Sequence, residues 1–86
     1  MELDKLRTEI DGIDEEMAEL FKKRMAVSEK IAAEKEKQGL PTLDLAREEQ
    51  VLKQAEERCG IYGREFFKKI MDLSKKYQSS LRAQKK

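Results

Sequence analysis

The chain has 86 residues, of which 43% are charged and 38% hydrophobic, with a net charge of +1, no histidine and one cysteine, Cys59. The small net charge provides no basic field for nucleic acid or an anionic membrane, and no apolar run approaches the ~20 residues of a membrane span. The missing histidine excludes the usual Cys/His zinc sites and Ser-His or Cys-His catalysis, so we expect one soluble cytoplasmic domain, residues 1–86, that works with Arg, Lys, carboxylate, Ser and Gln side chains.

The first segment, about residues 4–38, predicts one long helix. Asp4 is a plausible N-cap, and Gly39 followed by Pro41 is a strong stop signal. A helix of this length measures roughly 50 Å, too long for a compact monomer, so a second copy should cover much of it. Its apolar residues follow the 3-4 spacing of one buried stripe. The stripe consists of Leu3, Leu6, Ile10, Ile13, Met17, Leu20, Val27 and Ile31.

Two shorter helices are predicted after this one. The second runs from about residue 45 to 59. Asp44 can cap its start, and Gly60 follows its end. The third runs from about residue 63 to 84 and has a broad apolar face. No strand-like alternation is present. The pattern therefore predicts an all-α fold of three helices, one long and two shorter.

Arg24 lies on the stripe where an apolar residue is expected. A guanidinium at a buried position is costly unless an anion meets it. That anion could be a glutamate, which would make Arg24 a register-setting charge in a helical seam, or it could be a ligand. Periodicity alone leaves both interpretations open.

Two further basic residues bear on this choice. Lys35 lies eleven residues after Arg24, which places both on one helix face ~16 Å apart, and together they could bracket a small dianion. The alternative for Lys35 is a solvated charge in the run 34–37. Arg7 lies about 25 Å from Arg24 and is rotated by about 100°, so it could reach the same pocket only from a second, antiparallel chain. Its alternative is a solvated arginine.

Two polar pairs adjoin the apolar faces of the shorter helices. Arg47 and Glu48 lie near the start of the second helix, where a simple charge pair favoured by the helix dipole is the alternative. Ser74 and Gln78 are one turn apart on the third helix, where they could be polar residues at the edge of the core. Each pair alone is weak evidence for a functional site, and the stronger evidence is their joint arrangement over three helices.

This arrangement resembles the all-helical chorismate mutases, a family of small intertwined homodimers of the shikimate pathway. The resemblance spans about residues 3 to 82, and the first two segments align without gaps. It implies an intertwined helical homodimer here. The residues that carry it are Leu6-Arg7, Ile10, Ile13-Asp14, residues 20–24, Ile31-Ala32, Lys35, Leu40-Pro41, Asp44, residues 46–48, residues 70–74 and Gln78.

The third helix can be aligned with the family in two registers, because the stretch before it is shorter than in some members of the family. A gapless register would use Ser80 and Gln84. We prefer Ser74 and Gln78, because the apolar residues at 70 and 71 precede this pair as in the family.

The resemblance implies how chorismate would be held. Arg7 from the partner chain and Arg24 would bind its two carboxylates. Lys35 would contact a carboxylate and the ether oxygen of the breaking bond, and Gln78 would hydrogen-bond the same ether oxygen.

The same resemblance implies supporting roles for four residues. Glu48 and the backbone near Asp44 would hold the ring hydroxyl, Arg47 would line the site, and Ser74 would help to bind the ring carboxylate. The implied reaction, chorismate to prephenate in phenylalanine and tyrosine biosynthesis, is a unimolecular rearrangement that needs no nucleophile, proton transfer, metal or cofactor. It needs a restrained reactive conformer and donors at the ether oxygen. A glutamine donor needs no protonation, so a broad activity plateau at neutral and mildly alkaline pH is expected.

Two alternative functions remain from the sequence. Isochorismate-pyruvate lyases share this scaffold and most of these residues, and the loop 39–42 and an assay with isochorismate would discriminate them. A non-catalytic helical dimerisation module would explain the stripe, the charge content and the size. It would not explain an arginine on the stripe aligned with Lys35 and followed by two matching helices.

Overall fold

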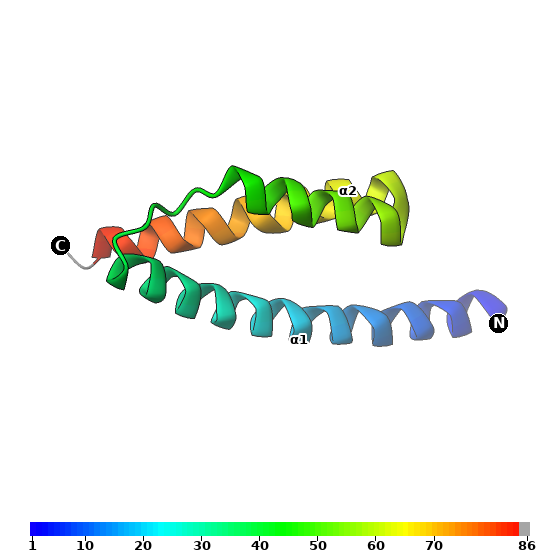
Figure 1. Cartoon of the computed structure of the whole chain (residues 1–86). Helices are drawn as coiled ribbons and strands as arrows, with labels where there is room; N and C mark the ends of the chain where they lie inside the picture. The colour runs from blue at the N-terminus through cyan, green and yellow to red at the C-terminus, as the bar shows by residue number, and fades with distance from the viewer. Residues whose placement is uncertain (85–86) are drawn as a thin grey trace.

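The computed structural model describes residues 1–84, which form two helical elements joined by the loop 38–44 (Figure 1). The first element, α1, spans Glu2–Lys37, and the second, α2, spans Leu45–Gln84. No strand occurs in this part of the chain. The predicted all-α class is confirmed. Within the described range, neither helix is both long and apolar enough to cross a membrane.

Helix α1 begins two residues before the predicted cap. Asp4 lies inside its first turn together with Glu2, where acidic groups favour the helix dipole. The helix ends at Lys37, and Gly39 two residues later has a left-handed φ of 71°. The Gly39 N–H donates to the Glu36 carbonyl at 3.1 Å, and the Leu40 N–H donates to the Lys35 carbonyl at 2.7 Å. These two bonds form the Schellman motif that a glycine at this position allows.

Helix α2 corrects the prediction of three helices, because the second and third predicted helices form one element. Only Gly60 departs from helical geometry inside it, with φ 75° and ψ −168°. Those angles are open essentially to glycine, so one residue reverses the chain and residues 61 and 62, expected in a loop, are helical. We call residues 45–59 the first arm and residues 61–84 the second arm.

The two arms of α2 run side by side after the reversal at Gly60 (Figure 1). Arg64 of the second arm pairs with Glu49 of the first at 3.2 Å, and Lys75 pairs with Glu48 at 2.6 Å. The arms run alongside most of α1, and only the N-terminal end of α1 extends past the turn at Gly60 (Figure 1). The resulting shape measures 56 × 27 × 14 Å.

The buried core is small and lies where α1 meets both arms. Its apolar members are Ala32, Leu52, Ala55 and Met71. The predicted stripe on the N-terminal half of α1 is not covered within this chain, since its residues from Leu3 to Leu20 are 44% to 62% exposed. An apolar face of this size on a small helical chain is typical of an interaction surface.

Candidate active site

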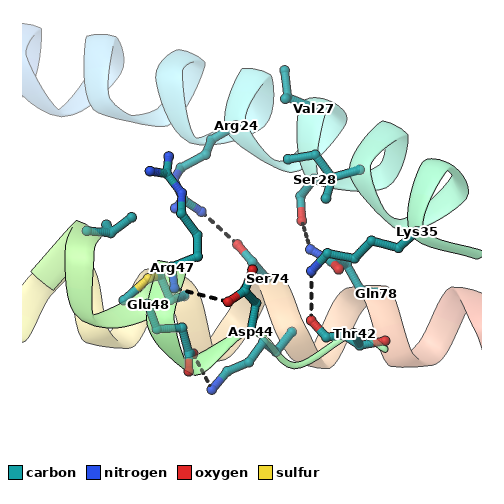
Figure 2. A pocket seen from close by; sticks show the side chains of 14 residues that line it. Arg24, Val27, Ser28, Lys35, Thr42, Asp44, Arg47, Glu48, Ser74 and Gln78 are labelled. Carbon is teal, nitrogen blue, oxygen red and sulfur yellow. Dashed lines mark hydrogen bonds and ion pairs between the residues drawn. The ribbon is translucent and has the colours of Figure 1, made fainter. Parts of the chain in front are cut away.

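A pocket of about 400 Å³ lies between α1, the loop 38–44 and both arms of α2 (Figure 2). Polar side chains converge on it from all four segments, while Val27, Ile31, Val51 and Met71 supply an apolar wall. A concave site with an apolar lining and a few convergent polar groups is typical of small-molecule binding. Its polar residues are Arg24, Ser28, Lys35, Thr42, Asp44, Arg47, Glu48, Ser74, Lys75 and Gln78.

Arg24 projects from the stripe of α1 into this pocket. Its Nη1 donates to Ser74 Oγ at 2.8 Å, and the guanidinium of Arg47 approaches it from the first arm (Figure 2). The pKa of Arg24 is lowered, first because burial desolvates the guanidinium and second because the charge of Arg47 repels it. Within residues 1–84, no carboxylate oxygen lies within 4 Å of the guanidinium nitrogens of either arginine. Two neighbouring cations without a protein counter-ion favour a bound anion.

Lys35 enters the pocket from the end of α1. Its Nζ donates to the Thr42 carbonyl at 2.8 Å, which ties the loop to the helix (Figure 2). Asp44 follows on the same loop and accepts a hydrogen bond from the Arg47 N–H at 3.1 Å. Asp44 therefore caps α2 as predicted, and its carboxylate is engaged by the helix start.

Buried polar side chains form a further part of the pocket wall. Gln78 Nε2 donates to Ser28 Oγ at 2.8 Å, and Gln78, Ser28 and Ser74 are each less than 8% exposed. Gln78 Oε1 is buried and has no hydrogen-bond partner among the described residues. An unpaired buried polar atom costs about 1–3 kcal/mol. Such groups are retained where a function requires them, which is consistent with a binding site.

Glu48 lies at the base of the pocket in an ion pair that the sequence did not reveal. Lys75 Nζ lies 2.6 Å from Glu48 Oε1, and Lys75 also contacts Asp72 at 3.5 Å. The pKa of Lys75 is raised, chiefly by its contact with Glu48. Lys75 and Glu48 are 27 residues apart and meet only because Gly60 reverses the chain. No local spacing could have signalled this pair, and the same holds for the Thr42 carbonyl that receives Lys35.

The structure places every predicted site residue in this pocket except Arg7. Arg7 is exposed near the start of α1 and does not line the pocket of its own chain. Of the two registers considered for the third predicted helix, Ser74 and Gln78 line the pocket, whereas Ser80 and Gln84 are exposed and lie outside it. The geometry thus favours the register preferred from the sequence.

The fold and the pocket define an all-helical protein with a cation-lined site suited to a small dicarboxylate. The family described as chorismate mutase type II matches residues 6–79, and the chain belongs to that family. This match confirms the resemblance found in the sequence. Membership implies an isomerase that converts chorismate to prephenate. Searches of curated proteins and of solved structures return no significant match.

Proposed function

We propose that the pocket in Figure 2 catalyses the rearrangement of chorismate to prephenate by restraining the substrate and stabilising charge on its ether oxygen. One observation carries this proposal. Arg24 and Arg47 face the pocket without a carboxylate partner in residues 1–84, and Lys35 enters it further along the same face of α1. Three cations that lack a carboxylate partner within residues 1–84 match a substrate with two carboxylates.

Arg24 and Ser74 would bind one carboxylate together. Their side chains lie 2.8 Å apart, so one carboxylate can accept hydrogen bonds from both after small adjustments. The second carboxylate would lie near Lys35, and Arg47 would line the site between them. These contacts would hold the enolpyruvyl side chain of chorismate over its own ring. The reactive conformer, which is rare in solution, would then be the one that is bound.

The reaction breaks one C–O bond and forms one C–C bond in a cyclic shift of electrons, and no proton is gained or lost. Negative charge develops on the ether oxygen as the C–O bond stretches. Lys35 Nζ from α1 and Gln78 Nε2 from the second arm would both donate to that oxygen, and Figure 2 shows both side chains at the pocket. Only one of the two Gln78 N–H groups is needed for Ser28, which leaves the other for substrate. Preorganised donors of this kind contribute about 10²–10³-fold in rate each.

The remaining roles concern the ring hydroxyl and the assembly. Glu48 and the backbone beside Asp44 would hold the ring hydroxyl. Arg7 would reach the second carboxylate from another copy of the chain in an intertwined homodimer, because its own chain places it outside the pocket and leaves the stripe around it exposed. The free, exposed Cys59 accords with the expected reducing, cytoplasmic environment.

The decisive experiment follows the loss of chorismate absorbance with purified protein and identifies the product as prephenate. No detectable turnover would sink the proposal and leave the non-catalytic dimerisation module. A parallel assay with isochorismate tests the lyase alternative, which predicts release of pyruvate. The chorismate mutase assignment requires the chorismate reaction to be the faster of the two.

A further inference from the structure

The ion pair between Glu48 and Lys75 belongs to the pocket, yet the proposed mechanism uses only its acidic member. Nζ of Lys75 lies 2.6 Å from Oε1 of Glu48, and the two side chains are 31% and 17% exposed. Within residues 1–84 this is the most sheltered of the ion pairs, and both of its members line the pocket. A sheltered charge pair is screened less by solvent and salt than an exposed one.

Lys75 is held from its other side as well. Asp72 Oδ1 lies 3.5 Å from Lys75 Nζ and 2.9 Å from Lys68 Nζ. A row of alternating charges therefore runs from Lys68 on the surface through Asp72 and Lys75 to Glu48. The first three residues are three or four positions apart on the second arm, the spacing at which helical side chains meet. This row fixes the ammonium of Lys75 at the pocket wall.

The two oxygens of the Glu48 carboxylate have different surroundings. Oε1 is buried and is the oxygen closest to Lys75, whereas within residues 1–84 no hydrogen bond reaches Oε2. Oε2 is thus the oxygen left to accept a hydrogen bond from a ligand. The positive charge beside Oε1 compensates the carboxylate, so this end of the pocket is close to neutral before any ligand enters.

We propose that Lys75 is a positioning residue that holds Glu48 for the ring hydroxyl and makes this end of the pocket select a neutral hydroxyl over a cationic substituent. The inference rests on the proposed function, which assigns Glu48 to the ring hydroxyl. A hydroxyl donates to Oε2 without a charge conflict. An ammonium group at the same place would gain little from the compensated carboxylate and would be repelled by Lys75. Specificity of this kind comes from the repulsive element as much as from the attractive one.

The test compares two substrates in three proteins. The substrates are chorismate and its analogue with an amino group in place of the ring hydroxyl, which is an ammonium ion at neutral pH as a lysine side chain is. The proteins are wild type, Lys75→Met and the control Lys76→Met, which removes an exposed charge one residue further on. Lys75→Met should raise KM for chorismate roughly tenfold with a smaller change in kcat, because the hydroxyl contact is present in both ground state and transition state.

The selectivity supplies the second readout. The ratio of kcat/KM for chorismate over the amino analogue should fall at least about tenfold in Lys75→Met, since an uncompensated Glu48 attracts an ammonium ion. Lys76→Met should leave both KM and this ratio as in wild type. A purely structural role for Lys75 would lower stability and activity with both substrates alike and would leave the ratio unchanged.

A second variant covers the case in which Lys75→Met fails to fold. Lys75→Gln keeps a donor for Glu48 without the charge, so its KM for chorismate should stay nearer to wild type while the selectivity ratio still falls. A ratio equal to that of wild type in Lys75→Met or Lys75→Gln overturns the inference and leaves the chorismate mutase proposal intact. Absence of chorismate turnover in wild type would instead overturn the proposed function itself.

Discussion

Replacing Arg24 by methionine separates binding of substrate from stability of the fold. Methionine keeps an unbranched stem on the stripe and removes the guanidinium. Truncating one partner of a sheltered, hydrogen-bonded charge pair costs about 2–5 kcal/mol, so kcat/KM for chorismate should fall about 30- to 5000-fold. The matched control is Lys23→Met, which removes an exposed charge one residue earlier on the same helix.

Stability should respond quite differently. The variant loses the 2.8 Å hydrogen bond to Ser74, whose Oγ keeps a contact with Met25 Sδ at 3.8 Å. It also relieves the desolvation and the repulsion by Arg47 that lower the pKa of Arg24. These effects oppose each other, so the free energy of unfolding should change by no more than about 1 kcal/mol, which corresponds to a Tm shift within about 8 °C.

The assays are steady-state turnover of chorismate and thermal unfolding followed by circular dichroism, both at one protein concentration, since the Tm of an oligomer depends on concentration. If Arg24 were instead a register charge of the helical seam, the variant would lose stability or change its oligomeric state while its kcat/KM per folded protein stayed within a few fold of the control. That pattern would refute the interpretation of Arg24 as a ligand-binding cation.

Three further predictions follow from other features. Gln78→Glu should make kcat/KM fall about tenfold per pH unit above the pKa of the new carboxyl, which donates only when protonated, while the wild-type profile stays flat from neutral to mildly alkaline pH. Gly60→Ala should lower the free energy of unfolding by about 1–3 kcal/mol in a thermal melt, because φ 75° with ψ −168° strains any other residue. If each site combines Arg7 of one chain with Lys35 of another, an equal mixture of inactive Arg7→Ala and Lys35→Ala, unfolded and refolded together, should recover about a quarter of wild-type activity, because half of the dimers are mixed and each mixed dimer has one intact site. No recovery of activity would contradict a shared site.

The sequence predicted the long helix and most of the pocket because both depend on local spacing. The stripe of α1 and the eleven-residue step from Arg24 to Lys35 follow directly from helical geometry, and the end of α1 follows from Gly39. The start of α1 was placed two residues late because Asp4 serves equally well in a first turn and at a cap.

What the sequence did not predict depends on how the chain reverses. Gly60 was expected to end one helix, and a loop was expected before the next. A single glycine with extended ψ makes the turn instead, so helix resumes at residue 61. The contact between Glu48 and Lys75 depends on that tight turn, because residue spacing within either helix alone does not bring the two side chains together. The position of Arg7 is a further case, since one chain alone leaves it outside the pocket.

The two arginines at the pocket, whose guanidinium groups have no carboxylate partner within residues 1–84, also affect how a ligand arrives. Arg47 is exposed and Arg24 half-buried, so their field extends from the pocket mouth into solvent. At physiological ionic strength, salt screens such a field over a Debye length of about 8 Å, and at low salt the field reaches further. A dianionic substrate is therefore steered toward this mouth before it touches the protein, and kcat/KM should decline as salt is added. The turnover number, which begins from substrate already bound, should be far less sensitive to ionic strength.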